Sequence, residues 1–533
     1  MSARHVAFVA YQDQPNLGIG YLASVLVKEG FKVEVLDYRK GFEAILERIR
    51  EMDPLLIGLS VIFQHYTPDF ANLVAHLRDN GIECPICAGG HYPSLERETC
   101  LQEMPGLDFI VRFEGEQTLL EVARQLRGGR NWRNVPGIAY LKDGGVMDTP
   151  LRPLAPDLDS LPFPKRWSLG LHCLGIRATS ILASRGCPRN CSFCSIRMFY
   201  SIPPGPVRRT RSPENVIEEM QQLYRNQGVR IFLFQDDDFS LMTKRDRDWT
   251  WHFLDCLDRS EMKGAIAWKI SCRSDEVEPE IFTAMRDAGL MFTYLGIESG
   301  HEAGLRVLNK HITVAQNLQA VQTLKSLGIS FDFGFMLFDP SSTIDRVLKN
   351  IRFVKRICGD GSSPVSFAKT LPYAGTDLES QMRKAGRLRG DVAAPDYSFL
   401  DRKTEEWFDY LCEVFYPWVY GGQSLQAQLR WAAFELDVLD RFYAHAPGLE
   451  EHRKRVRFLT HWYNEIYCKI VEDSSGYFRT PHPGNLHALA GIRSAAEQQR
   501  NWIEDQLALQ RQDFFTSAGF PLETVLGQVD APS

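Results

Sequence analysis

The first 140 residues alternate between short apolar runs and segments that repeat apolar residues at helical spacing. The runs are typical of buried parallel strands, and the segments between them are typical of amphipathic helices. The predicted strands are 6–10, 32–36, 55–60, 85–88 and 108–111, and the predicted helices are 18–28, 68–80 and 116–126. This order predicts a Rossmann-like doubly wound parallel sheet over residues 1–140, with ligands beyond the carboxyl ends of its strands.

A second set of strand and helix patterns fills residues 179–390. The predicted strands are 179–183, 229–234, 265–271, 291–295, 330–337 and 365–371, and the predicted helices are 213–227, 249–258, 279–288, 314–327 and 342–358. Six such repeats predict a partial (β/α)6 TIM-type barrel, in which the chemistry lies at the carboxyl ends of the strands. The fold class is therefore α/β.

The remaining segments lack this alternation. Residues 141–178 are rich in proline and are predicted to be a linker. Residues 391–533 are predicted to be a helical domain, with helices within 402–446, 450–472 and 485–511 and a frayed end after residue 527. One segment is rich in aromatic residues: Trp407, Phe408, Tyr410, Phe415, Tyr416, Trp418 and Tyr420. These side chains either form the core between helices or cap the open side of the barrel against water.

Composition narrows the class of protein. The 533 residues are 44% hydrophobic and 24% charged with a net charge of −6, which is ordinary for a globular protein and does not indicate a nucleic-acid partner. The basic run Arg208, Arg209 and Arg211 is interpreted as a solvated face. No stretch resembles a signal peptide or a membrane span, and 12 cysteines without regular pairing fit a reducing compartment, so we expect a cytoplasmic protein without a membrane partner.

Three cysteines carry the strongest chemical signal. Cys187, Cys191 and Cys194 have the spacing Cys-x3-Cys-x2-Cys directly after a predicted strand. A 4Fe-4S cluster normally takes four cysteinates, so three ligands leave one iron open. The alternatives are buried apolar cysteines or a zinc knuckle, for which the nearest further thiol, Cys173, lies well upstream.

With this loop the sequence resembles the radical S-adenosylmethionine (SAM) enzymes. In that family SAM chelates the open iron, and one electron from the 4Fe-4S cluster cleaves SAM to a 5′-deoxyadenosyl radical. The polar residues that follow the predicted barrel strands resemble the SAM-binding segments of the family. By this resemblance the SAM site comprises Phe193, Asp236, Asp237, Asp238, Ser271, Arg273, Glu298, Ser299 and Leu371.

Within that set, the resemblance assigns Ser271 and Arg273 to the carboxylate or ribose of SAM, and Glu298 to its amino group or ribose. The alternative is that Arg273 and Glu298 form a structural ion pair inside the barrel. Phe338 and Asp339 occupy a stretch where many relatives have glycine, so a backbone contact with adenine is not expected there.

Loops of the N-terminal sheet resemble the cobalamin-binding domain that precedes the radical SAM core in one large subgroup. The residues implied for cobalamin are Asn16, Gly18, Gln64, His65, Gly89, Gly90, His91, Glu114 and Glu116. The Asp-x-His-x-x-Gly loop that ligates cobalt in other cobalamin enzymes is absent, so the lower face is expected to be unligated or met by Gln64, His65 or His91. The alternative is a scaffold of the same fold without cobalamin.

Together these features resemble a cobalamin-dependent radical SAM methyltransferase of the class B type. The resemblance implies methylation of an unactivated carbon in a small molecule such as a natural product, with a reductant such as flavodoxin or ferredoxin. Two alternatives stay open: a radical dehydratase, epimerase, cyclase or rearrangement enzyme without methyl transfer, and a non-enzymatic regulator that binds a cluster or cobalamin. The motifs do not identify the substrate or the oligomeric state.

Overall fold

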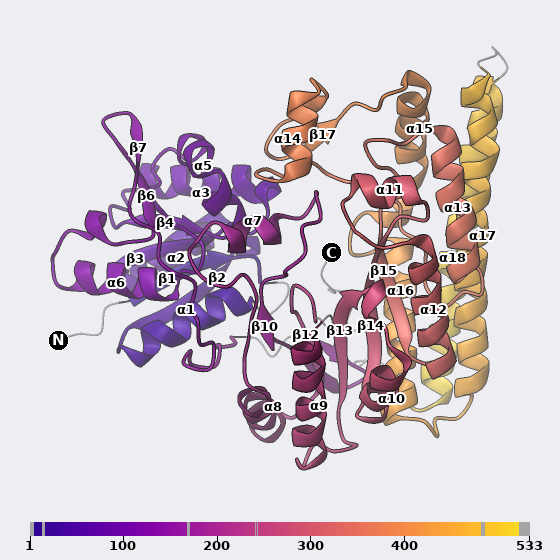
Figure 1. Ribbon diagram of the computed structural model, residues 1–533, viewed down its shortest axis with the longest axis horizontal. Helices are drawn as coiled ribbons and strands as arrows, with labels where there is room; N and C mark the ends of the chain where they lie inside the picture. The colour runs from indigo at the N-terminus through magenta and orange to yellow at the C-terminus, as the bar shows by residue number, and fades with distance from the viewer. Residues whose placement is uncertain are drawn as a thin grey trace. The chain divides into compact units, whose positions relative to one another are not determined.

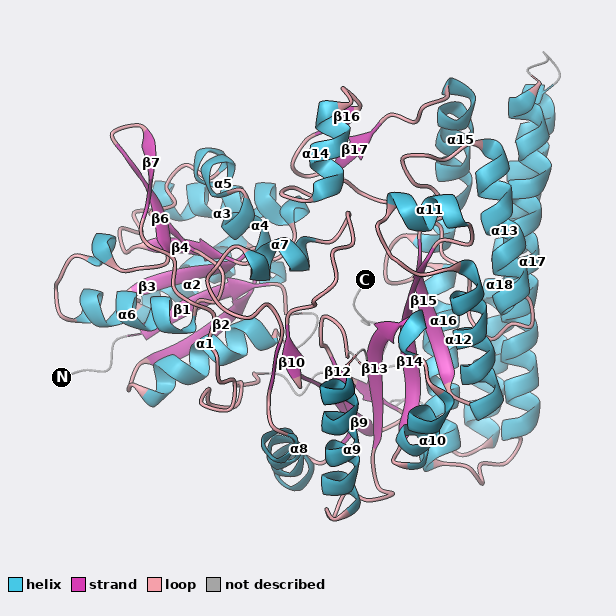
Figure 2. Ribbon diagram, in the orientation of Figure 1, coloured by secondary structure: helices cyan, strands magenta, loops and turns pink. Residues whose placement is uncertain are grey.

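The structure of the protein is a computed structural model that describes residues 5–12, 16–167, 171–239, 241, 243–480 and 485–521. The predicted frayed end after residue 527 lies outside the described residues. The chain divides into two compact units, whose elements are labelled in Figure 1 and coloured by type in Figure 2. The first unit comprises Met1–Gly170, Ser180–Glu219 and Leu371–Tyr397, and the second comprises Leu171–Thr179, Met220–Thr370 and Ser398–Ser533.

A seven-stranded sheet forms the centre of the first unit, in the order β2-β1-β3-β4-β5-β6-β7. Its strands are β1 (His5–Ala10), β2 (Lys32–Asp37), β3 (Leu56–Ser60), β4 (Ile86–Gly89), β5 (Phe109–Val111), β6 (Ile138–Lys142) and β7 (Gly145–Asp148). Its helices are α1 (Leu17–Lys28), α2 (Phe42–Met52), α3 (Thr67–Asp79), α4 (His91–Leu95), α5 (Arg97–Glu103) and α6 (Glu116–Arg127). Strands β1 to β5 pair in parallel, which confirms the predicted parallel sheet.

Both faces of this sheet are covered. Along β1, Val6 and Phe8 pack into one hydrophobic core, whereas Ala7 and Val9 pack into another on the opposite face. A strand that is buried on both faces has few polar positions, because neither face meets water. This is why the run 6–10 can be recognised in the sequence as a parallel strand.

Two features of this unit differ from the prediction. Helix α2 was not predicted, although its buried residues Ile45, Ile49 and Met52 have helical spacing. The start of the predicted linker contains a strand that was not predicted, since β7 lies within residues 141–178 and pairs with β6 in an antiparallel hairpin. Asp143 and Gly144 both have positive φ in that turn, and such a pair matches the twist of a two-residue hairpin.

A six-stranded sheet, in the order β15-β14-β13-β12-β9-β8, forms the barrel-like part of the chain. Its strands are β8 (His172–Cys173), β9 (Ile176–Ile181), β12 (Val229–Phe234), β13 (Ala267–Arg273), β14 (Leu290–Glu298) and β15 (Ser330–Phe335). The helices that accompany it are α8 (Pro213–Gln227), α9 (Lys244–Asp258), α10 (Pro279–Asp287), α11 (Glu302–Val307), α12 (Val314–Leu327) and α13 (Ile344–Cys358). Strands β12 to β15 are parallel, as expected for a partial barrel.

The sixth predicted barrel strand, 365–371, is not a strand. It forms only an isolated bridge between Lys369 and Phe338. The backbone of Val365 is instead bonded by side chains of the helical region: its N–H donates to Asn464 Oδ1, and its carbonyl accepts from the Tyr463 hydroxyl. A backbone group that is already paired with a side chain cannot join a strand ladder.

Four helices form the C-terminal part of the second unit: α15 (Arg402–Val419), α16 (Leu425–Phe442), α17 (Leu449–Arg479) and α18 (Asn485–Ser517). Trp407, Phe415 and Trp418 are fully buried among them, which favours the interpretation of these aromatic residues as a helix core. Helix α17 packs against both α13 and α18, as Figures 1 and 2 show. Within the described residues, no helix combines the length and apolar character needed to cross a membrane.

Asp437 of α16 makes the second unit sensitive to pH. Burial raises its pKa to about 8, and although Oδ1 accepts a hydrogen bond from Ser330, the buried Oδ2 has no partner within the described part of the chain. The folded state therefore holds a proton on Asp437 between its ordinary pKa and about 8, where the unfolded state has lost it, so stability falls as pH rises through that window.

We expect Asp437→Asn to remove this dependence, because the amide keeps the shape of the acid without its charge. Melting temperatures of the variant and wild type should agree at about pH 5, and the variant should be the more stable at about pH 9. Anaerobic circular dichroism measures both. Parallel pH profiles for the two proteins would contradict the assignment.

Candidate functional site

The three motif cysteines lie in one loop of the first unit. The loop follows β10 (Ser184–Arg185), which pairs with β11 (Arg209–Thr210), and it ends at α7 (Ser195–Ser201). Within the described residues Cys187, Cys191 and Cys194 form no disulfide and are only partly buried, and Phe193 between them is half-buried. Buried apolar cysteines would be sealed from any ligand, so the partial exposure fits metal-binding thiols.

Cys173, the further thiol considered for zinc, has a different character. It is fully buried on β8, and burial raises its pKa well above the ordinary value. A metal ligand must be a thiolate, and burial in apolar surroundings disfavours that form. The surroundings of Cys173 therefore do not support its role as a fourth ligand.

Gly186 allows the chain to turn from β10 into the cysteine loop. Its φ is +81°, and a Cβ at this position would lie 1.9 Å from the carbonyl oxygen of Val207. Any side chain would meet this backbone atom, which cannot rotate away. Glycine is therefore required at the entrance to the loop.

We expect Gly186→Ala to lower the stability by more than the about 1–3 kcal/mol of backbone strain alone, and to reduce iron incorporation. Gly175→Ala is the matched control, because Gly175 has the same φ of +81° with no atom within 4 Å of its Cβ position. Chemical denaturation and iron content after anaerobic reconstitution measure both effects. Equal losses in the two variants would show that the close contact at Val207 is unimportant.

Two glutamates from the segment that leads from β5 into α6 hold the arginine that precedes this loop. Arg185 lies 3.1 Å from Glu114 and 2.7 Å from Glu116, and Arg209 of β11 lies 2.8 Å from Glu114. Glu114 also accepts a hydrogen bond from the backbone N–H of Ala155 at 2.9 Å. Burial alone would raise the pKa of Glu114, but the hydrogen bond from Arg209 and the charge of Arg185 hold it below its usual value. The carboxylates implied for cobalamin are thus occupied by arginines.

A second ion cluster involves Arg211, which directly follows β11. Glu219 accepts hydrogen bonds from Arg166 at 2.8 Å and from Arg211 at 2.5 Å, and all three side chains are nearly fully buried. The interpretation of Arg209 and Arg211 as a solvated face was therefore wrong. Their burial depends on glutamates that are distant in sequence, and such partners leave no local pattern.

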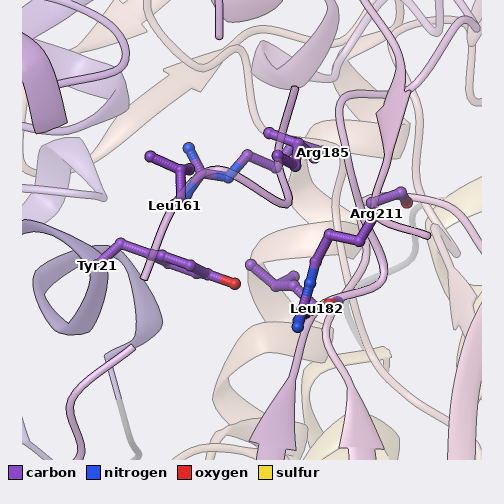
Figure 3. A pocket seen from close by; sticks show the side chains of 7 residues that line it. Tyr21, Leu161, Leu182, Arg185 and Arg211 are labelled. Atoms are coloured by element: carbon purple, nitrogen blue, oxygen red, sulfur yellow. Dashed lines mark hydrogen bonds between the residues drawn. The ribbon is translucent and has the colours of Figure 1, made fainter. Parts of the chain in front are cut away.

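Tyr21 of α1 packs between these clusters. Figure 3 shows it in a small pocket together with Leu161, Leu182, Arg185 and Arg211. The guanidinium of Arg185 stacks 4.7 Å from the centre of the Tyr21 ring, and burial raises the pKa of the Tyr21 hydroxyl to about 12. The hydroxyl stays protonated at neutral pH, so the pocket stabilises the loop by packing and cation–π contact.

The segment predicted as the last barrel loop, which begins at Leu371, also belongs to the first unit. It contains α14 (Asp377–Lys384), β16 (Leu388–Gly390) and β17 (Pro395–Tyr397). The backbone N–H of Leu378 donates to the carbonyl of Ser192, inside the cysteine loop, at 2.8 Å. Gln64 donates to Val392 and accepts from Ala374, so its amide is occupied as well.

The other residues implied for cobalamin lie at the carboxyl ends of β1, β3 and β4. Asn16 caps α1 and donates to Ser60, whereas Gly18 is exposed in the first turn of α1. His65 is exposed, stacks on Phe63, and has its pKa lowered mainly by partial burial. The exposed Gly18 and His65 can therefore contact a ligand directly.

His91 and the preceding glycines have a different role in the structure. Burial lowers the pKa of His91 to about 4, and its ring lies 4.4 Å from that of Phe199 in α7. A Cβ on Gly90 would lie 2.4 Å from the carbonyl oxygen of Val61, whereas one on Gly89 would meet nothing closer than 3.5 Å. Gly90 is thus required for packing, and Gly89 leaves the neighbouring backbone accessible.

The polar residues implied for SAM end the strands of the second unit. Arg273 is oriented by Asp275 at 2.9 Å and by the carbonyl of Lys310 at 2.6 Å, while its buried Nη1 has no hydrogen-bond partner among the residues that the structure describes. Glu298 has φ +63° and lies 3.3 Å from Lys310. Arg273 and Glu298 therefore have separate partners, Asp275 and Lys310, so the alternative of an ion pair between the two is not what the structure shows.

The space around Glu298 is kept open by glycines on either side. A Cβ on Gly334 would lie 2.9 Å from Glu298 Oε2, and one on Gly296 would lie 3.2 Å from Oε1. Together with the free Nη1 of Arg273, these features fit a ligand with a carboxylate and an amino group, because a buried donor without a partner is costly. Lys310 was not predicted, since it does not belong to a strand-end motif.

The remaining strand-end residues flank this region. Asp236 and Asp238 are buried after β12, Asp237 is exposed, and Ser299 is fully buried beside Asn350. Ser271 of β13 accepts a hydrogen bond from Lys269 at 3.0 Å. Phe338 packs against Phe399 and Phe408, and Asp339 is bonded to Ser341, so both replace the expected glycine with packed side chains.

Comparisons with known proteins match these two regions separately. The B12 binding domain model matches residues 3–123, and the radical SAM superfamily model matches residues 181–354. An uncharacterized methyltransferase of Pyrococcus horikoshii is 31% identical over 375 residues, covering 68% of this chain and 77% of that protein. The anaerobic magnesium-protoporphyrin IX monomethyl ester cyclase of Cereibacter sphaeroides is 26% identical and covers 61% of this chain, but only 53% of the cyclase is matched.

A solved structure shares the whole fold. The cobalamin-dependent S-adenosylmethionine radical enzyme OxsB, with aqua-cobalamin and S-adenosylmethionine bound, superimposes with a TM-score of 0.68 at 18% identity. The match covers 99% of this chain and 81% of OxsB. At this identity the similarity shows the fold alone.

Proposed function

Because the chain belongs to the radical SAM proteins that carry a B12-binding domain, we propose that it methylates an unactivated carbon of a small-molecule substrate. The two domains imply a 4Fe-4S cluster, SAM and cobalamin as cofactors. The observation that carries the proposal is the presence of both domain matches in one chain that is 31% identical to a methyltransferase. A one-electron reductant such as flavodoxin or ferredoxin belongs to the proposal.

When bound, these cofactors supply the electron, the radical precursor and the methyl carrier, and the protein supplies position and water exclusion. Cys187, Cys191 and Cys194 would hold the cluster as thiolates. Arg273 would donate from its free Nη1 to the carboxylate of SAM, since a guanidinium pairs well with that group. Glu298 would accept from the amino group of SAM, and Lys310 balances its charge when no ligand is bound.

For cobalamin, the exposed residues support the assignment better than the buried ones. Gly18, Gly89 and His65 would contact the cofactor, because their surfaces are open at the carboxyl ends of the strands. Asn16, Gln64, Gly90, His91, Glu114 and Glu116 would support the surrounding loops, since each is committed to a contact within the protein. His65 is the one exposed histidine of this set that could meet the lower face.

A second candidate keeps the radical but omits methyl transfer. It is favoured by the 26% identity to a cyclase and the 25% identity to the 4'-phospho-dehydrooxetanocin synthase of Priestia megaterium. The same cysteines and SAM-binding residues would serve that reaction. The two candidate reactions differ in the products that are formed from SAM.

The test is an anaerobic assay of the reconstituted protein with SAM and a reductant. Bound cobalamin in the absorption spectrum, together with both 5′-deoxyadenosine and S-adenosylhomocysteine, is the expected result. Deoxyadenosine without S-adenosylhomocysteine in the presence of substrate would favour the second candidate. Neither product from a protein with an intact cluster would overturn both.

A further inference from the structure

A row of polar side chains crosses the inner face of the six-stranded sheet, below the strand ends assigned to SAM. Ser271 of β13 is in register with Tyr294 of β14, which is in register with Asp332 of β15. Registered residues of parallel strands point to the same face, and Lys269 shares that face because it lies two residues before Ser271. The neighbouring Trp268 and Ile270 are fully buried on the opposite face.

Helix α16 contributes a further charge to this row. Arg430 Nε lies 2.7 Å from Asp332 Oδ2, and its Nη2 donates to Ser366 at 2.7 Å. Asp332 also accepts a hydrogen bond from Ser363 at 3.1 Å. The guanidinium is therefore fixed in place while its side chain remains 37% exposed.

Three side chains of this row can donate further hydrogen bonds to a ligand. The Nη1 of Arg430 and the hydroxyl of Tyr294 make no hydrogen bond to any residue that the structure describes, and Tyr294 is 37% exposed. Lys269 bonds only to Ser271 within the described part of the chain. Two cations and a phenol thus face the same open side, whereas the carboxylate of Asp332 is already paired.

The carboxylates near these side chains do not remove their ability to donate hydrogen bonds to an anion. Asp236 and Asp332 act on Lys269, and desolvation lowers the pKa of Lys269 to about 8, so the ammonium still predominates at neutral pH. Burial, with Asp332 and Glu298, raises the pKa of Tyr294, so its hydroxyl remains a donor. Glu298 is itself paired with Lys310.

We propose that Lys269, Tyr294 and Arg430 form an anchor for an anionic oxygen group of the substrate, a carboxylate or a phosphate ester. The proposal rests on the function proposed above and specifies its substrate class. Planar or tetrahedral oxyanions match the geometry of a fixed guanidinium, and the adjacent ammonium and phenol supply the additional donors. Neutral hydrocarbon substrates would leave these donors without partners.

The test uses the reconstituted holoenzyme with saturating SAM, and inorganic phosphate and acetate as separate probes. Phosphorus NMR and saturation-transfer NMR measure their dissociation constants. Binding of phosphate alone indicates a phosphate ester, binding of acetate alone indicates a carboxylate, and binding of either or both supports the anchor. Absence of binding by both probes, or displacement of the probe by SAM, would overturn it.

Variants localise the binding. Arg430→Gln is expected to weaken the bound probe about ten-fold or more, and Tyr294→Phe, which removes a single hydroxyl, by several-fold. Arg455→Gln is the matched control, because Arg455 is exposed on α17 and pairs with Glu451 of its own helix and with Gln510. Equal affinities in the Tyr294→Phe variant, Arg455→Gln and wild type would place any bound anion elsewhere and overturn the proposal.

The fold of each variant is checked by its melting temperature, and the near-isosteric Tyr294→Phe keeps the test valid if Arg430→Gln unfolds. Formation of 5′-deoxyadenosine from SAM is measured in parallel. Its absence in the wild type would count against the proposed function, whereas the probe affinities decide the anchor independently.

Discussion

Replacement of Cys187, Cys191 or Cys194 by alanine is expected to abolish formation of 5′-deoxyadenosine. Each cysteine is partly exposed on a loop held by two buried ion clusters, so loss of one thiolate removes a ligand without removing the supports. A 4Fe-4S cluster with two protein ligands is not retained stably. Iron and sulfide content, together with chromatography of the SAM products, measures the outcome.

Cys84→Ala is the matched control, because Cys84 is also a partly buried free thiol but lies just before β4, outside the loop. This variant should keep wild-type iron content and deoxyadenosine formation. Persistent deoxyadenosine formation in all three loop variants would show that the radical is generated elsewhere or by another mechanism.

Glu114→Ala is expected to cause the second large effect, on both stability and iron content. The substitution leaves Arg185 and Arg209 in buried positions without the carboxylate they share. Removal of one partner from a buried ion cluster typically costs about 3–5 kcal/mol, because the remaining charges stay desolvated. Since Arg185 lies two residues before Cys187, we also expect a loss of iron incorporation.

Denaturant titration under anaerobic conditions measures the stability, and iron analysis measures the site. Glu121→Ala is the control, because Glu121 pairs with Arg152 in a more exposed position. A surface pair of that kind contributes about 0–1 kcal/mol, so the control should remain close to wild type. If Glu114→Ala were as stable as this control and lost only cobalamin, Glu114 would instead belong to the cobalamin site.

Some features of this protein depend only on residues that are close together in the sequence. The spacing of Cys187, Cys191 and Cys194 is a local property, since three ligands of one cluster must be carried on a short loop. The buried run 6–10 is local in the same way, because a strand that is covered on both faces must be apolar at every position. Patterns of this kind were sufficient to predict the parallel sheet and the strands β12 to β15, and to recognise the resemblance to radical SAM proteins.

The roles of individual polar residues, in contrast, depend on partners that are distant in the sequence. Glu114, Glu116 and Gln64 lie at the ends of sheet strands, where a ligand is expected, yet the structure gives them partners far away in sequence. Arg209 and Arg211 are part of a basic run that is typical of a solvated face, yet buried glutamates pair with both. The charge of a residue can be read from the sequence, but the residue with which it forms an ion pair cannot.

The sequence by itself therefore determined the class of chemistry, because the cysteine spacing and the strand patterns depend on neighbours along the chain. Only the tertiary structure decided which polar groups are committed to the scaffold and which, like Arg273 Nη1, keep a free donor for a ligand. The physical reason is desolvation: a buried charge must be paired, and the partner is chosen by the packing of distant segments.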